Sequence, residues 1–250
     1  MKHVAMTSAS ARWRLDLVVT LLAGALPLAW DASNGDLAAA RAFGDASGFA
    51  QRDSWWASRL IHDGGRMLSW AVLAGLVLAA LRPARPGQHS HQHSHHPSRS
   101  QRWCWIGVML LCVVAVPALK RGSLTSCPWD LAEFGGLARH VSHWAWARAD
   151  GGPGHCFPSG HAVAAFAFFG QYFLWRDHAP GRARAWLAAV LLVGSVYGGA
   201  QLARGAHYPS HTLWSAWLCW LICVLAAQAM ALHAARRATQ AHNASAGDQP

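Results

Sequence analysis

The chain has 250 residues, of which 53% are hydrophobic and only 13% are charged. Soluble domains carry about 25% charged residues, so this composition, with its 15 tryptophans, excludes an ordinary soluble protein and favours an integral membrane protein. The formal net charge of +10 does not indicate nucleic-acid binding, because the arginines cluster at the ends of apolar runs, where basic residues set membrane topology.

Six apolar segments follow one another along the chain. They are Leu15–Trp30, Met67–Leu81, Trp103–Leu119, Phe157–Trp175, Ala185–Ala203 and Thr212–Leu232. A spanning helix needs about 20 predominantly apolar residues, which the last three segments supply most clearly, while the second is short unless it extends back toward Ile61. The pattern predicts an all-α fold, a bundle of six transmembrane helices.

The first apolar segment has two interpretations. It follows Lys2, Arg12 and Arg14, an arrangement that also describes the basic and apolar regions of a signal peptide. No clear small-x-small cleavage motif comes after it, so we expect a retained helix.

The distribution of charge predicts how the six helices are oriented. One side holds the N-terminus, loop 82–102, loop 176–184 and the C-terminus, and it carries 12 of the 21 Lys and Arg residues but 3 of the 11 Asp and Glu residues. Basic loops stay in the cytoplasm, so loops 31–66, 120–156 and 204–211 are expected to face outward. Loss of the first segment as a signal peptide does not change this orientation.

We expect one membrane domain over residues 1–237 and a disordered tail over residues 238–250. Loop 82–102 is of low complexity and is predicted to be a disordered cytoplasmic linker. It contains five histidines, which are His89, His91, His93, His95 and His96. Such a tract can bind a divalent metal weakly, so a transporter or metal-handling protein is an alternative function.

Two cysteines, Cys127 and Cys156, fall in the same outward loop. The space outside a bacterial inner membrane is oxidising, so we predict a disulfide between them, with two free thiols as the alternative.

Three polar patches lie at the outward ends of the last four segments: residues 120–128, 158–161 and 200–211. Their chemically active side chains are Lys120, Arg121, Ser159, His161, Arg204, His207 and His211. Phosphoryl transfer needs cations and fixed N–H donors around the phosphate oxygens, and this mixture supplies them.

A helix start at the second patch adds to this pattern. Backbone N–H groups there lack helical partners, and Gly160 allows a phosphate to approach closely. One neutral histidine can attack phosphorus while a second, charged one protonates the leaving oxygen. Lysine and arginine can neutralise the phosphate, so neither a metal nor a cofactor is required. The alternative is a zinc site in which His207 and His211 are joined by a histidine of the outward loop, His140, His143 or His155.

These motifs resemble the type 2 phosphatidic acid phosphatase superfamily, which also includes vanadium haloperoxidases. The family signature is K-x6-R-P, then P-S-G-H, then S-R-x5-H-x3-D, and the resemblance covers roughly residues 103–232. PSGH is intact at residues 158–161. Cys127 stands where the first motif has arginine, and His211 stands where the third has aspartate. The serine and arginine of the third motif fall on Ala200 and Gln201.

The resemblance implies a role for each matching position. His207 is expected to be the nucleophile, His161 the general acid, and His211 the residue that orients the nucleophilic imidazole. The phosphate-binding residues are expected to be Lys120, Ser159, Gly160, Gln201, Arg204 and Arg121. Because His211 is not an acid, Asp130 or Glu133 could assist it.

The expected protein is a phosphatase of the bacterial inner membrane that acts on a lipid phosphate or diphosphate, with its active site at the outer, periplasmic face. The lipid tails can stay in the bilayer while the head group reaches the outer loops. A lipid phosphotransferase with the same site, and a non-catalytic family member that only binds lipid phosphate, are alternatives. The peroxidases of the family are soluble, which sets them apart from this chain.

Overall fold

The computed structural model describes residues 2–82 and 96–247 and is mostly helical. Five stretches are long and apolar enough to cross a membrane, so the composition's indication of a membrane protein agrees with the fold. They are Arg12–Ala32 within α1 (Lys2–Ala32), Trp55–Leu81 (the π-helix η1, Trp55–Gly64, continuing into α3, Gly65–Leu81), α4 (Arg99–Arg121), α7 (Pro180–Ala203) and Pro209–Gln240 within α8 (Pro209–Gly247).

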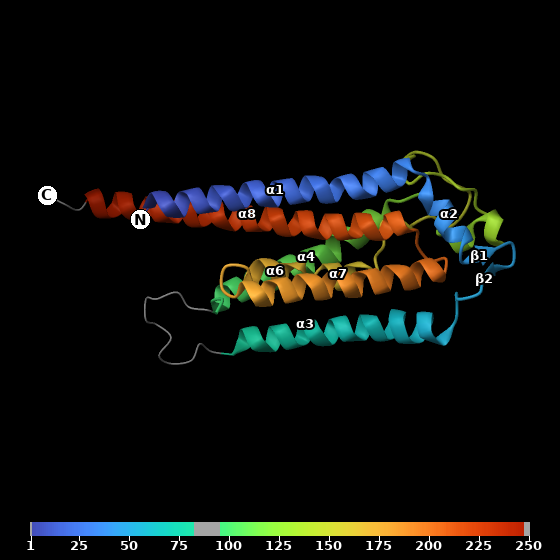
Figure 1. Cartoon of the computed structure of the whole chain (residues 1–250), viewed down its shortest axis with the longest axis horizontal. Helices are drawn as coiled ribbons and strands as arrows, with labels where there is room; N and C mark the ends of the chain where they lie inside the picture. Colours follow the sequence, from blue (N-terminus) through green and yellow to red (C-terminus); the bar gives the residue numbers. More distant parts are fainter. Residues whose placement is uncertain (1, 83–95, 248–250) are drawn as a thin grey trace.

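The long helices lie side by side, with α1 against α8 along one side of the bundle and α3 along the other (Figure 1). Helices α4, α6 and α7 lie between them (Figure 1). Their shared core includes Trp105, Met109, Phe166 and Trp220. At Gly194 of α7 a Cβ atom would lie 2.2 Å from the Phe166 ring, so only glycine allows α7 to pack this closely.

The fourth apolar segment differs from its prediction. Only part of the segment Phe157–Trp175 is helical, because residues 157–162 form a turn and the helical part, Val163–Trp175, consists of α5 (Val163–Phe166) and α6 (Phe169–Trp175). At 1.5 Å per residue it is about 20 Å long, against about 30 Å for the bilayer core. Neighbouring helices bury most of it, so it is an inner helix of the bundle.

Short elements cover the end of the bundle opposite the two chain termini (Figure 1). They are α2 (Gly35–Arg41), the antiparallel strands β1 (Gly44–Asp45) and β2 (Gly48–Phe49), and the 3-10 helices η2 (Pro128–Asp130) and η3 (Ala132–Phe134). A small core that includes Ala40, Phe49, Phe134 and Tyr208 joins these elements to the start of α8. Loops 31–66 and 120–156 are therefore folded against each other.

Helices extend into two segments that the sequence predicts to be disordered. Helix α4 begins at Arg99, with Ser98 and Gln101 forming a capping box, so the last residues of the 82–102 loop are helical. Helix α8 continues through Gly247, past the predicted start of the tail at residue 238, in a stretch rich in the strong helix former alanine. The histidines from His89 to His95 lie outside the described residues.

Candidate active site

The three polar patches meet where α4 ends, α5 begins and α7 connects to α8. Lys120 lies in the last turn of α4, the PSGH turn precedes α5, and residues 200–211 form the connection. The side chains at this end are deeply buried rather than spread over the surface. Ser159, Gln201, His207 and His211 are each less than 5% exposed.

Helix α8 holds the PSGH turn in place. The backbone N–H of Ser159 donates to the carbonyl oxygen of His211 at 3.1 Å, and the Ser215 hydroxyl donates to the carbonyl oxygens of both residues. Among the described residues, the backbone N–H groups of Gly160 and His161 make no hydrogen bond. These two donors remain for a bound anion at the start of a helix.

Lys120 lies against this turn. A Cβ atom on Gly160 would be 3.7 Å from Lys120 Cδ, and the lysine has no hydrogen bond or ion pair with any described residue. A half-buried ammonium without a carboxylate partner is unfavourable unless an anion completes it. The position therefore suits a phosphate group between Lys120 and the free N–H donors.

His161 stands between two aromatic rings. Its imidazole stacks on His62 with ring centroids 4.4 Å apart and packs against Tyr197 at 4.9 Å. Its Nε2 atom is buried and has no partner among the described residues. Burial, and then the charges of His62 and Arg204, lower the pKa of His161 to about 3, so the ring is neutral in the absence of substrate.

His207 and His211 form a buried pair. Their Nδ1 atoms are 3.3 Å apart, so one donates a hydrogen bond to the other. Because Nδ1 of His207 is used in this way, Nε2 is the atom left to attack phosphorus. Burial, followed by the charge of Lys120, lowers the pKa of His207 well below its usual value, which keeps the imidazole neutral as a nucleophile must be.

The remaining predicted phosphate ligands differ in placement. Gln201 is buried, and its Nε2 atom has no partner among the described residues. Arg204 donates from Nε to the carbonyl oxygen of Arg52 at 2.8 Å, and burial lowers its pKa, while its charge still acts on His161. Arg121 is exposed and has no described hydrogen bond or ion pair with the other candidates, so the structure does not bring it into the site.

The predicted pair Cys127 and Cys156 forms a disulfide in the structure. Cys156 Sγ lies 3.6 Å from His207 Nδ1. The bridge therefore ties the loop after α4 directly to the wall of the site beside the histidine pair, in the place of the arginine of the family signature. Neither possible helper acid, Asp130 nor Glu133, has a described contact with this pair.

Sequence reasoning missed the part played by the first half of the chain. His62 of η1 stacks on His161, and Arg66 at the start of α3 also lowers its pKa by its charge. Single-turn π-helical insertions recur at functional sites, and here a ten-residue π-helix presents His62. The signal in the sequence was a histidine and an arginine, His62 and Arg66, just before the apolar segment Met67–Leu81. The sequence did not reveal how the preceding residues fold.

A zinc site on His207 and His211 finds no support in the geometry. The metal-ligand group that contains His207 is completed by Cys127 and Cys156, whose sulfur atoms are already joined to each other. His143, a possible third ligand, instead forms a separate group with Asp31 and Asp36.

The fold and the site define a class of protein: a helical membrane protein whose buried histidines and unpaired donors suit a phosphate ester. A model of the PAP2 superfamily matches residues 101–234, more than half of the chain. The chain therefore belongs to the PAP2 superfamily, as its motifs indicated, and this membership supports phosphatase-type activity on phosphate esters. No curated protein and no solved structure matches the chain.

Proposed function

We propose that the protein is a lipid phosphate phosphatase of a bacterial inner membrane, with six spans and its site at the periplasmic face. It removes a phosphate or diphosphate group from a membrane lipid through a phosphohistidine, without a metal. The observation that supports this most strongly is the gathering of unpartnered donors around two neutral histidines. These donors are the Lys120 ammonium, the backbone N–H groups of Gly160 and His161, and the Gln201 amide.

In the binding step, the phosphate oxygens accept hydrogen bonds from Gly160 N–H and His161 N–H and pair with Lys120. The negative charge of the phosphate opposes the effect of the nearby cations on His161. Its pKa therefore rises from about 3 toward the range in which the ring carries a proton.

In the chemical step, His207 Nε2 attacks phosphorus, and the bond from phosphorus to the lipid oxygen breaks. His161 Nε2 gives its proton to that leaving oxygen. His211 holds the His207 ring through the bond between their Nδ1 atoms. Water then attacks the phosphohistidine while His161 takes a proton back, which releases inorganic phosphate and restores His207.

An apolar cavity of about 160 Å³ supports a lipid as the substrate. It is lined by residues of α3, α4 and α5, among them Trp70, Met109 and Ala164, and it reaches Gly160 of the phosphate-binding turn and Arg66. A hydrocarbon tail placed there would bring its head group to the donors. The apolar lining excludes water and offers nothing to a polar alcohol.

The test measures phosphate release by the detergent-purified protein from phosphatidic acid, phosphatidylglycerol phosphate, undecaprenyl diphosphate and a lipid A phosphate. We expect release from at least one lipid and a loss of about 10²–10⁴-fold in rate for His207→Ala and for His161→Ala. His178→Ala is the matched control, because His178 lies between α6 and α7 at the other end of the bundle. Turnover that survives His207→Ala, or no release from any lipid, contradicts the proposal.

Two further measurements separate the alternatives. Ala164→Phe fills the apolar cavity and is expected to raise KM for a long-chain lipid phosphate but not for a short-chain one. Added glycerol becomes phosphorylated if the protein is a phosphotransferase, whereas a phosphatase releases only inorganic phosphate.

A further inference from the structure

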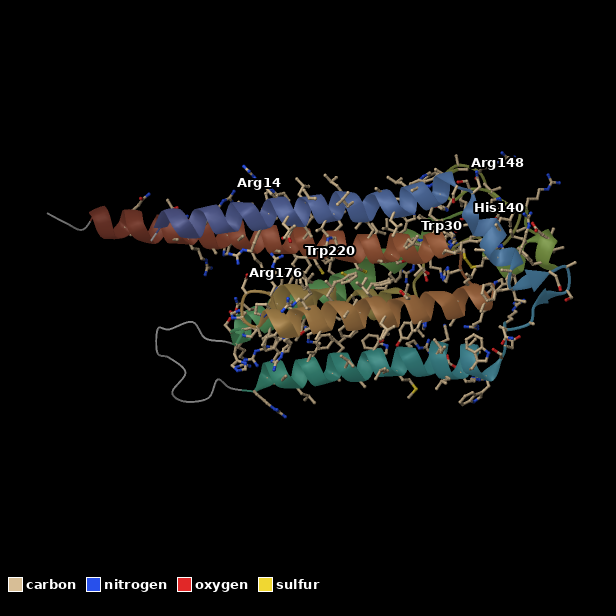
Figure 2. All side chains as sticks on the ribbon, viewed as in Figure 1. Arg14, Trp30, His140, Arg148, Arg176 and Trp220 are labelled. Atoms are coloured by element: carbon tan, nitrogen blue, oxygen red, sulfur yellow. A yellow bond between two sulfur atoms is a disulfide. The ribbon has the colours of Figure 1, made fainter. Side chains whose placement is uncertain are left out.

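A second polar cavity, of about 330 Å³, lies at the same end of the bundle, between α1, α2 and the loop that precedes the PSGH turn. Trp30 and His140, which line it, lie near α2 in Figure 2. His211 also lines this cavity, whereas Lys120, His161 and His207 are not among its described lining residues. The cavity therefore lies next to the proposed active site without being part of its phosphate pocket.

Three side chains from three separate elements converge in this cavity. Asp31 at the end of α1, Asp36 in α2 and His143 in the loop each offer a ligand atom, and these atoms all lie within 4.8 Å of one another. His143 Nε2 is 3.3 Å from Asp31 Oδ2. Two carboxylates and one imidazole are a ligand set that divalent zinc accepts.

The Asp31 carboxylate is held by two hydrogen bonds, but one of its oxygen atoms has no partner among the described residues. The indole N–H groups of Trp144 and Trp214 both donate to its Oδ2 atom at 2.9 Å, which fixes the carboxylate. Its Oδ1 atom is buried and has no partner among the described residues. A buried carboxylate oxygen without a donor is unfavourable, and a cation would complete it.

The charges in the cavity are unbalanced. Asp36 accepts hydrogen bonds from the Trp30 indole and from Ser210 but has no described cationic partner, and the arginine that lines the cavity, Arg41, is paired with Glu133. A divalent cation would balance the two carboxylates and accept the lone pair of the His143 imidazole.

Tyr208 supplies an independent observation. Only 5% of this residue is exposed, it lines the cavity, and its buried hydroxyl has no partner among the described residues. Burial, followed by the charge of Asp36, raises its pKa, so the hydroxyl keeps its proton. A water molecule bound to a cation donates strongly, and the Tyr208 hydroxyl oxygen can accept that hydrogen bond.

We propose that Asp31, Asp36 and His143 bind one Zn²⁺ ion. The ion joins the end of α1, α2 and the loop before the PSGH turn. It acts on the neighbouring site by position and takes no part in the chemical step. His143 stacks on Phe157, next to the PSGH turn, with ring centroids 4.1 Å apart, and packs edge-on against His211 at 5.6 Å. The ion therefore fixes the wall against which His211 rests.

The test is calorimetric titration of the chelator-treated, detergent-purified protein with Zn²⁺, using an affinity tag without histidine. The histidines from His89 to His96 are replaced by serine in every sample, because that tract can bind metal by itself. We expect one equivalent of Zn²⁺ to bind and Co²⁺ to give visible absorption bands at the same site. His143→Phe keeps the ring that stacks on Phe157 and removes the ligand atom, and we expect at least about 100-fold weaker binding.

Asp31→Asn is the second variant, since it keeps the size of the side chain and removes its charge, and we expect a similar loss. His140→Phe is the matched control: it lies in the same loop and lines the same cavity but is outside the three-ligand group, so binding is expected to stay unchanged. No stoichiometric binding of Zn²⁺ or Co²⁺ by the otherwise unchanged protein overturns the proposal, whatever the variants do. Unchanged affinity in both ligand variants overturns it as well. Metal binding is measured without turnover, so this result is independent of the phosphatase assay.

Discussion

Selected polar side chains at the two ends of the bundle differ in whether they have partners. At the end that carries both chain termini, several arginines are partnered: Arg176, which lies toward that end in Figure 2, donates to both carboxylate oxygens of Asp16 at 2.9 Å. Arg12 pairs with Asp177, and Arg182 lies over the ring of Trp175. These charges are used to hold helices together.

At the other end Arg41 pairs with Glu133, but several donors of the candidate site lack partners within the described residues. Lys120, Nε2 of His161 and Nε2 of Gln201 are all enclosed by protein, yet none of these atoms has a described hydrogen bond. A fold maintains such unsatisfied groups only where something else completes them. This contrast supports the proposal that an anion binds at the second end.

The largest expected effect concerns Lys120. Lys120→Met should lower kcat/KM for a lipid phosphate by about 10²–10³-fold, because it removes a charge that stabilises the phosphate oxygens. Thermal stability in detergent should stay the same or rise, since the variant also removes an unpaired buried charge. Lys120→Arg keeps the charge and serves as the control. A Met variant that loses stability together with activity would indicate a structural role.

At Arg176 we expect a substitution to lower stability and to leave activity almost unchanged. Arg176→Met leaves the buried carboxylate of Asp16, whose side chain is 7% exposed, without its partner. We expect a loss of about 3 kcal/mol in the free energy of unfolding, with kcat changed by less than about twofold. Thermal or denaturant unfolding in detergent measures the first quantity and phosphate release the second. Adding Asp16→Asn should restore most of the stability, and a double variant as unstable as the single one contradicts this explanation.

A pH profile tests the neutral state of His161. Burial lowers the pKa of His161 to about 3, so the protonated fraction of the free enzyme falls about tenfold per pH unit as pH rises above that value. We expect kcat/KM to fall with rising pH between about 5 and 8, and kcat to fall less, because the bound phosphate raises this pKa. His161→Gln is the control: the substrate ionises in the same way in its assay, but the variant has no imidazole at this position. The same slope in that variant rules out His161 as the source.

The smallest effect is expected at Gln201. Gln201→Leu removes a buried amide that has no partner for its Nε2 atom, so we expect stability to rise by about 1 kcal/mol. The same change should raise KM for the lipid phosphate by about tenfold, since one donor to the anion is lost. Gln201→Glu is the sharper comparison, because a negative charge at this place repels phosphate and should raise KM further. An unchanged KM in both variants removes Gln201 from the binding site.

Local sequence was enough to predict the parts of the site that depend on a single segment. The PSGH turn, the buried pair His207 and His211 and the disulfide between Cys127 and Cys156 all follow from short motifs or from loops on one side of the membrane. Family membership was likewise predictable, because its signature lies within residues 101–234.

The features that depend on packing between distant segments were not predictable. His62 reaches His161 only because η1 packs beside α7, and Asp31, Asp36 and His143 meet only after three separate elements have folded together. The helical part of the fourth segment begins at Val163, just after the PSGH turn at which the sequence placed its start. Its division into two short helices depends on packing and was not predictable.

The stacking of His62 on His161 has a consequence for how this chain can be altered. The region shared with the family begins at residue 101, whereas His62 and Arg66 belong to the part that precedes it. The matched part therefore carries the groups that we propose to react, and the preceding part contributes His62 and Arg66 to their surroundings. Chimeras that exchange the first hundred residues between family members should keep the reaction type and alter which head groups are accepted.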